Sequence, residues 1–309
     1  MRIVFMGTPD FAVNILQVLI DSEYSVVGVV TQPDRLVGRK KVLTPPPVKK
    51  LALENNISVF QPERIKNNYK QVIDWHPDII ITCAYGQIIP KELLELPEYK
   101  AINVHASLLP KYRGGAPIHR AIIDGEKETG ISIMYMDEKM DEGNIISQEK
   151  IEIKKDYNVG TLHDKLSLIG AKLLMETLPS IFSNTNKSIK QDNAKATYAY
   201  NIKPEDEKII WDKNSEQIYN QIRGLNPWPG AYTLLDNKRV KVYKSIEVSN
   251  NKSGQPGEII SIVKDGIIVK AGNNTSIKLL EVKLAGKRLQ TIKEILNGNH
   301  PFEIGKIFK

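Results

Sequence analysis

Apolar and amphipathic segments alternate along roughly the first 185 residues of the chain. Five runs rich in isoleucine and valine are predicted to be buried strands, at 3–7, 25–31, 78–85, 101–105 and 131–136. Helical patterns lie at 10–20, 48–55, 116–124 and 161–178. Buried strands that alternate with helices typically form a parallel sheet covered on both faces. The pattern therefore predicts a doubly wound, mostly parallel α/β domain.

The pattern changes in the last third of the chain. Residues 184–206 are polar, with scattered lysine, asparagine and threonine, and they predict a linker. Ser215 can cap a short helix, and five short strand candidates follow at 231–235, 240–248, 258–263, 267–271 and 277–282. The strongest hairpin signal between them is Asp265-Gly266. Such closely spaced short strands predict a small antiparallel β-barrel, of which the oligonucleotide-binding barrel is one kind.

We therefore divide the 309 residues into an α/β domain at 1–188, a linker at 189–206 and a C-terminal β-barrel domain at 207–309. No apolar run approaches the ~20 residues of a membrane span, and the start of the chain lacks a signal-peptide pattern. The single cysteine, Cys83, cannot form an internal disulfide. These features predict a cytoplasmic protein that does not enter a membrane, and we expect a monomer.

The net charge of +7 is unevenly distributed. Residues 207–309 carry 17 Lys and Arg against 10 Asp and Glu, whereas residues 1–206 carry 26 of each kind. An excess of positive charge confined to one domain favours binding to a polyanion such as nucleic acid. The alternative is a coding bias toward lysine, which should have affected both halves of the chain.

Candidate chemistry lies near the ends of two predicted strands. Asn103 and His105 are two residues apart on the strand at 101–105, so their side chains project from one face. Asp141 follows the strand at 131–136, and the carboxyl ends of parallel strands would bring all three together. An amide, an imidazole and a carboxylate suit a reaction through a tetrahedral oxyanion. The alternative is a hydrogen-bonded core histidine beside a strand-end asparagine.

A basic segment follows the second predicted strand. It is longer than the ~2–6 residues usual for a strand-to-helix connection, and we expect it to form a loop with a mobile tip around Gly38. Its cations are Arg35, Arg39, Lys40 and Lys41. They could follow a nucleic-acid backbone and become ordered on binding, or they could serve solubility alone.

Other common chemistries find less support in the sequence. The turn after the first strand has one glycine, Gly7, and lacks the repeated glycines of a nucleotide-phosphate loop. The remaining histidines have no cysteine, histidine or carboxylate partners at metal-ligand spacing. We therefore expect no metal.

Several motifs resemble one known family. The string Asn-x-His-x-Ser-Leu-Leu-Pro at 103–110, followed by the Met-Asp-x-Gly turn at 140–143, resembles the signature of enzymes that use 10-formyltetrahydrofolate. Gly-Thr-Pro-Asp-Phe-Ala at 7–12 and Asn-Pro-Trp-Pro at 226–229 resemble the tRNA formyltransferases of that family. The matches keep their order along essentially the whole chain. Glu142 and Asn144 depart from the usual pattern, which has threonine and aspartate there.

The resemblance implies an enzyme of translation initiation. Its co-substrate would be 10-formyltetrahydrofolate, and the formyl group would pass to the α-amino group of methionine on initiator tRNA. Asn103 would stabilise the oxyanion, and His105 would donate to the same oxygen or pass a proton to N10. Asp141 would orient the imidazole or accept the proton of the amine, and the order of proton transfer stays open.

The resemblance also implies which residues bind the two substrates. The folate would lie against Gln87, Ile88, Ser107, Leu108, Leu109 and Pro110. The acceptor end of the tRNA would meet Arg35, Arg39, Lys40 and Lys41. Two other hypotheses stay open: a formylfolate enzyme acting on an amino sugar, on glycinamide ribotide or by hydrolysis, and a non-catalytic RNA-binding protein. The first would not need the basic loop, and the second would not need Asn103, His105 and Asp141 together.

Overall fold

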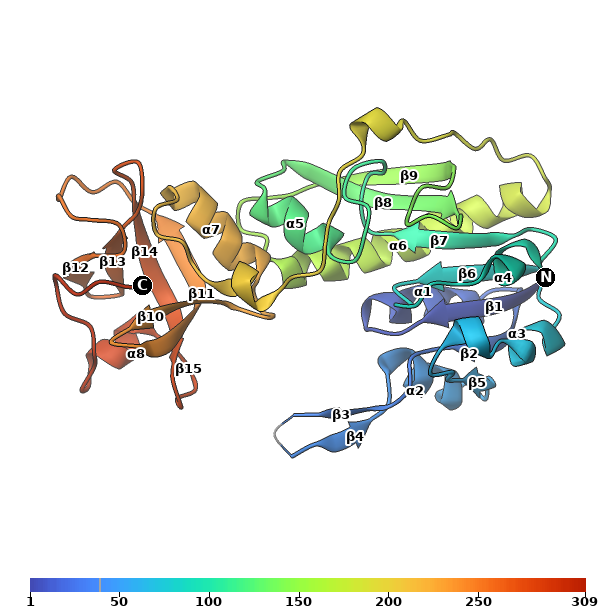
Figure 1. The fold of residues 1–309 in the computed structure, drawn as a ribbon, viewed down its shortest axis with the longest axis horizontal. Helices are drawn as coiled ribbons and strands as arrows, with labels where there is room; N and C mark the ends of the chain where they lie inside the picture. The colour runs from blue at the N-terminus through green and yellow to red at the C-terminus, as the bar shows by residue number, and fades with distance from the viewer. Residues whose placement is uncertain (39) are drawn as a thin grey trace. The chain divides into compact units, whose positions relative to one another are not determined.

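The computed structural model describes residues 1–38 and 40–309, and its course is shown in Figure 1. The chain forms two compact units. The first, here called the α/β unit, comprises Met1–Pro117, Glu128–Glu152 and His163–Tyr200. The second, here called the C-terminal unit, comprises Ile118–Lys127, Ile153–Leu162 and Asn201–Lys309.

A seven-stranded sheet forms the centre of the α/β unit. Its strands are β1 (Arg2–Gly7), β2 (Ser25–Val30), β5 (Val59–Phe60), β6 (Ile79–Cys83), β7 (Ala101–His105), β8 (Glu128–Tyr135) and β9 (Ile145–Glu152). They lie in the order β5-β2-β1-β6-β7-β8-β9. The pairings from β5 to β7 are parallel, and β8 and β9 pair antiparallel. The predicted mostly parallel α/β sheet is confirmed.

The strands of this sheet are buried on both sides because helices cover both of its faces. The helices of the α/β unit are α1 (Phe11–Ile20), α2 (Pro47–Glu54), α3 (Lys70–Asp74), α4 (Lys91–Glu95) and most of α6 (Val159–Phe182). Helix α5 (Pro117–Ile123) belongs, apart from Pro117, to the C-terminal unit. On one face, Val4, Met6 and Ile80 pack with apolar residues of α3 and α4. On the other, Gly170 of α6 lies close to Ile15 of α1 and Val104 of β7.

The prediction of a parallel strand at 131–136 is wrong in direction, because β8 runs antiparallel to β7. The sequence analysis also missed β9, which reads Ile-Ile-Ser-Gln-Glu-Lys-Ile-Glu. Burial along β9 alternates between intermediate and exposed positions, as is typical of an edge strand with one face toward solvent. A search for continuous apolar runs does not find such a strand.

The basic segment after β2 is not the loop we expected. Two short strands, β3 (Arg35–Val37) and β4 (Val42–Thr44), pair antiparallel with Leu36 opposite Leu43. This β3–β4 ribbon extends away from the large sheet (Figure 1). Its base is tied to α2 because Lys49 Nζ donates to both carboxylate oxygens of Asp34 at 2.9 Å. Hydrogen bonds from Gln61 and Lys49 hold the pKa of Asp34 below its ordinary value.

The C-terminal unit contains the predicted antiparallel sheet with one strand more than expected. Its strands are β10 (Ala231–Leu235), β11 (Lys238–Glu247), β12 (Ile259–Val263), β13 (Gly266–Lys270), β14 (Ser276–Leu284) and β15 (Leu289–Thr291). The order is β10-β11-β14-β13-β12, and β15 also pairs with β14. Helices α7 (Ser215–Gly224) and α8 (Ile292–Leu296) accompany the sheet. The N-cap of α7 is Asn214, one residue before the predicted Ser215.

The last residues of the chain close this sheet. Leu234 of β10 exchanges two backbone hydrogen bonds of 2.9 Å with Lys309. On the opposite edge, Ile259 of β12 donates to Lys306 O and accepts from Gly305 N. The terminal segment therefore bridges β10 and β12, the two edge strands, and leaves less of their backbone unpaired.

Two of the hairpins in this sheet have turns of two residues. Asp236 and Asn237 both have positive φ, +48° and +59°, as a two-residue type I′ turn between β10 and β11 requires. The predicted hairpin at Asp265-Gly266 joins β12 to β13, but Gly266 pairs with Val263 and is already the first residue of β13. The turn residues there are Lys264 and Asp265.

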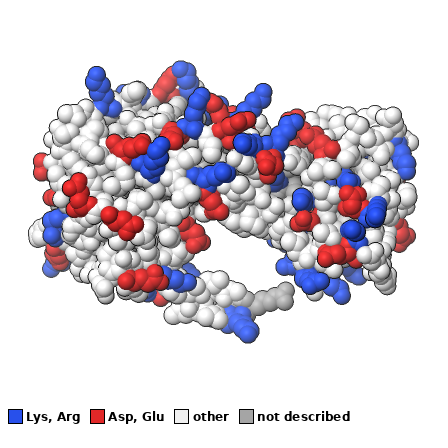
Figure 2. All heavy atoms as spheres, turned by 180° about the vertical axis from the view of Figure 1, so that it is seen from behind, with Lys and Arg blue, Asp and Glu red and all other residues white. Residues whose placement is uncertain are grey.

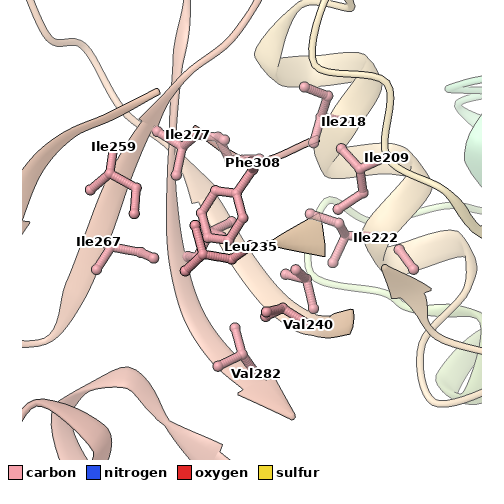
Figure 3. Close-up of a cluster of buried hydrophobic side chains, with 14 of the residues drawn as sticks. Ile209, Ile218, Ile222, Leu235, Val240, Ile259, Ile267, Ile277, Val282 and Phe308 are labelled. Carbon is pink, nitrogen blue, oxygen red and sulfur yellow. The ribbon is translucent and has the colours of Figure 1, made fainter. Parts of the chain in front are cut away.

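A single apolar core fills the C-terminal unit. Figure 3 shows Phe308 at its centre, among Leu235, Ile277 and neighbouring side chains from several strands and α7. Phe308 is 2 % exposed, and its ring stacks on Trp211 with centroids 5.6 Å apart. The terminal segment that bridges the two edge strands therefore also supplies a principal core residue.

We expect Phe308→Ala to lower the free energy of unfolding by about 3–5 kcal/mol, because it removes a buried ring and leaves a cavity. Chemical denaturation of the full chain, followed by tryptophan fluorescence, measures this change. Ile304→Ala is the matched control, since Ile304 is 63 % exposed in the same segment. Equal effects of the two variants would show that the terminal segment does not contribute to the core.

Candidate active site

Asn103 and His105 project from the same face of β7, and Thr82 of the neighbouring strand β6 lies beside Asn103 on that face. His105 is 5 % exposed, whereas Asn103 is half-buried. The imidazole Nε2 lies 3.0 Å from the backbone oxygen of Tyr112. Because a carbonyl oxygen only accepts hydrogen bonds, Nε2 carries a proton in this contact. The ring therefore presents Nδ1 to its remaining neighbour.

That neighbour is Asp141, in the loop between β8 and β9. Its Oδ2 lies 3.7 Å from His105 Nδ1 and accepts a hydrogen bond of 2.8 Å from the backbone N–H of Gly114. We expected the carboxyl ends of parallel strands to bring Asp141 to His105, and this reason is wrong. Because β8 is antiparallel to β7, the carboxyl end of β8 lies beside the amino end of β7, away from His105. The chain must return after Tyr135 for Asp141 to reach His105.

Thr82 fixes the orientation of the Asn103 amide. Its hydroxyl lies 2.8 Å from Asn103 Oδ1 and donates to that oxygen. Thr82 is 3 % exposed, so this bond is shielded from water. With the amide oxygen accepting from Thr82, Asn103 still has the two N–H donors of its amide. The amide can therefore donate to a developing negative charge.

The loop after β7, Ser107 to Pro110, is held by hydrogen bonds within the α/β unit. Ser107 is fully buried, and its hydroxyl donates to Lys111 O at 2.6 Å. The hydroxyl of Ser132 donates to Ser107 O and accepts from Leu109 N. Leu109 is 3 % exposed, while Leu108 and Pro110 are partly exposed. The Ser107 hydroxyl is thus used to hold the loop.

Gln87 and Ile88 lie in the loop after β6 and differ in their surroundings. Gln87 Oε1 accepts from Ile65 N at 2.7 Å, and its Nε2 donates to Pro62 O at 3.2 Å. Gln87 therefore connects two loops. Ile88 is 83 % exposed, which is unusual for an isoleucine and leaves an apolar side chain at the surface.

The cations predicted in the segment after β2 lie on the β3–β4 ribbon, except that Arg39 lies outside the described residues. Arg35, Lys40 and Lys41 are exposed, and Arg35 comes within 4.0 Å of Glu63. The ribbon also exposes Leu36, Val37, Val42 and Leu43 by 54–62 %. Figure 2 shows it mostly white along its length, with Lys or Arg near its end.

Three other functional features were sought among the residues that the structure describes: a metal site, a membrane-spanning helix and a reactive cysteine. These residues include no group of three or more histidine, cysteine, aspartate or glutamate side chains able to hold a metal ion. None of the helices at 1–38 and 40–309 is long and apolar enough to span a membrane. Cys83 is fully buried, and burial raises the pKa of its thiol, so it is a poor nucleophile.

Three contributors to this site were not predicted from the sequence. Thr82 could have been found from its place on the neighbouring strand, since parallel strands set Thr82 beside Asn103. The Tyr112 carbonyl and the Gly114 N–H belong to the backbone, and their roles leave no signal in residue type. Gly114 has φ of +117° and lies close to Ala199 O, which suits glycine.

Comparison with known families covers both units. Residues 1–178 match the model described as formyl transferase, and residues 201–300 match formyl transferase, C-terminal domain. The two matches define an enzyme of the formyl transferase class. A methionyl-tRNA formyltransferase of Staphylococcus aureus (strain bovine RF122 / ET3-1) is 53 % identical over 307 residues, covering 99 % of this chain and 98 % of that protein. The chain therefore belongs to the methionyl-tRNA formyltransferase family.

Solved structures show the same fold. An N-formyltransferase from Helicobacter canadensis, in complex with folinic acid and dTDP-3-aminofucose, is 21 % identical with a TM-score of 0.68, covering 90 % of this chain and 98 % of that one. Methionyl-tRNA formyltransferase from Clostridium thermocellum is 21 % identical with a TM-score of 0.56, covering 82 % and 95 %.

Thr82→Val should lower kcat for formyl transfer by about 3- to 30-fold, because the isosteric side chain no longer holds the Asn103 amide. KM for the formyl donor should change little. Thr82→Ser keeps the hydroxyl and should retain most of kcat. Steady-state kinetics of the three proteins test this role, and equal kcat for Thr82→Val and wild type would contradict it.

Proposed function

We propose that this chain transfers the formyl group of 10-formyltetrahydrofolate to the α-amino group of methionine carried by initiator tRNA. The observation that carries this proposal is the pairing of His105 with Asp141 at 3.7 Å beside an asparagine amide of fixed orientation. The family membership supplies the acceptor, methionyl-tRNA, because the Staphylococcus aureus relative bears that name over 99 % of this chain.

The reaction forms one C–N bond and breaks another. The neutral amine attacks the formyl carbon, and the formyl oxygen takes the negative charge of the tetrahedral intermediate. The intermediate then releases N10, which gains a proton, while the amine loses one. Asn103 Nδ2 donates to the oxyanion, since Thr82 holds its oxygen elsewhere. No protein nucleophile is needed, because the substrate amine supplies the attacking electron pair.

His105 and Asp141 move the proton in this proposal. The carboxylate accepts from the Gly114 N–H, which fixes one oxygen toward the imidazole. Asp141 stabilises a positive charge on the ring when the amine gives up its proton. In this proposal Nδ1 takes up the proton of the amine and then gives it to N10, while the Nε2 proton stays on the Tyr112 carbonyl. One pair of residues thus acts as base and acid in turn.

The folate would lie against Ile88 and the loop at Ser107 to Pro110, which directly follows the strand that carries His105. Ile88 offers 83 % of its surface, and the rigid loop at Ser107 to Pro110 provides backbone groups of fixed position. Flat heteroaromatic rings bind in such places by apolar contact and backbone hydrogen bonds. Gln87 would act by holding the loop that carries Ile88. The Helicobacter canadensis relative was solved with folinic acid.

The tRNA would meet the β3–β4 ribbon. Arg35, Arg39, Lys40 and Lys41 supply cations for phosphates, and the exposed Leu36 and Leu43 supply apolar contact with bases. The excess of Lys and Arg at 207–309 would add long-range attraction. An assay with charged initiator tRNA, free methionine and an amino sugar as acceptors tests the proposed function. Faster formylation of the sugar than of the tRNA would contradict it.

Asn103→Ala should lower kcat by roughly 10²–10³-fold, as expected when one oxyanion donor is lost. His105→Ala and Asp141→Ala should have effects of similar size. The double variant should be far from additive, because the two residues act as a unit. Single-turnover measurements at saturating folate give these values, and near-normal turnover of His105→Ala would exclude the proposed mechanism.

Lys40→Ala combined with Lys41→Ala should raise KM for tRNA and flatten its dependence on salt. The slope of log KM against log salt should fall by up to about 0.9 for each lost duplex phosphate contact. Lys150→Ala combined with Lys172→Ala is the matched control, since these exposed lysines lie on β9 and α6. Identical salt slopes for the two double variants would assign the ribbon lysines to solubility.

A further inference from the structure

We propose that Gln191 is a positioning residue for Asp141, acting through the backbone of the loop that carries it. This inference rests on the proposed catalytic function of Asp141. Gln191 lies in the stretch predicted to be a linker at 189–206, far from every motif that marks the site. It is 6 % exposed.

The side-chain amide of Gln191 uses all of its ordinary hydrogen-bonding capacity. Its Nε2 donates one proton to Asp141 O at 2.8 Å and the other to Gly143 O at 2.7 Å. Its Oε1 accepts from Nε and Nη2 of Arg113 at 3.1 and 2.8 Å. The Gln191 amide therefore connects the backbone at both ends of the turn 141–143 to the buried guanidinium of Arg113.

Arg113 holds this amide in place. The arginine is 1 % exposed, so its charge needs partners within the protein. Nη2 donates to Asn193 Oδ1 at 2.8 Å, and Nη1 lies 3.3 Å from Glu142 Oε1. Glu142 thereby ties the middle of the same turn to Arg113. The three consecutive residues 141–143 are all held by this network.

The turn needs such support because its backbone is unfavourable. Asp141 has φ of +53°, in the left-handed region that is unfavourable for residues with a side chain, although aspartate tolerates it better than most. Gly143 has no room for a larger residue, since a Cβ there would overlap the Tyr135 carbonyl oxygen. The hydrogen bonds from Gln191 to the two flanking carbonyls stabilise this shape.

The strip that carries Gln191 is itself fixed. Ile189 exchanges hydrogen bonds of 2.9 and 2.8 Å with Ile145 of β9. Further along, Thr197 O accepts from Arg113 N at 2.9 Å, and Ala199 N donates to Arg113 O at 2.7 Å. Gln191 therefore lies between two anchored points, and it can transmit their position to Asp141.

Two substitutions separate the contact with the turn from the contact with Arg113. Gln191→Met removes all the hydrogen bonds at similar volume. Gln191→Glu keeps an acceptor for Arg113 but loses both donors to Asp141 O and Gly143 O. If the donors position Asp141, both variants should lower kcat by about 10- to 100-fold, the scale of a small misplacement of a catalytic group. KM for the formyl donor should stay within about twofold.

Asn193→Ala is the matched control, because Asn193 also accepts from Arg113 but does not touch the turn. It should leave kcat within about twofold, and the thermal unfolding midpoint of each variant shows separately how much stability is lost. The Asp141→Asn background provides a second test. There, Gln191→Met and Gln191→Glu should cause almost no further loss of kcat, because residues that act through one another are not additive.

The outcomes distinguish the two levels of the proposal. If Asp141→Asn alone leaves kcat unchanged, the proposed role of Asp141 is wrong. If Asp141→Asn lowers kcat but Gln191→Glu does not, the catalytic role stands and the positioning role is overturned. Equal loss of kcat from Gln191→Met in the wild-type and Asp141→Asn backgrounds would likewise show that Gln191 supports the fold and does not act through Asp141.

Discussion

The candidate site in the α/β unit depends on one constraint. The Asp141 carboxylate is held beside the His105 ring by the loop between β8 and β9, and this loop has to reverse its course. The antiparallel pairing of β7 with β8 carries the chain away from His105, and the return to Asp141 leaves that residue with φ of +53°. The Gly114 N–H and the Gln191 amide supply the compensating hydrogen bonds. Because both come from segments distant in sequence, the site forms only when the whole unit has folded.

The sequence predicts those parts of the structure that follow from the type and spacing of neighbouring residues. Continuous isoleucine and valine runs located the central strands, and the two-residue spacing of Asn103 and His105 gave their common face. The antiparallel edge, by contrast, depends on β9, whose alternating polar positions resemble a solvent-exposed connection. The β3–β4 ribbon was missed for a related reason, since each strand has only three residues and lacks a buried face.

The candidate site was predictable to the same extent. Its three side chains were found from residue type and motif, but the groups that orient them were not. Tyr112 and Gly114 act through their backbone, whose hydrogen bonds do not depend on residue type. Gln191 lies in a polar strip without periodicity, so its burial beside Arg113 follows from tertiary contacts alone. Short-range patterns carry no information on such contacts.

The β3–β4 ribbon has a consequence for the behaviour of the protein at high concentration. Its four exposed leucine and valine side chains sit on strands that have free outer edges, and such edges are templates for pairing with another chain. Arg35, Lys40 and Lys41 place like charges on this ribbon, so two copies repel each other where they would otherwise add strand to strand. The same cations that we propose to contact the tRNA thus also oppose self-association, and high salt should weaken both effects together.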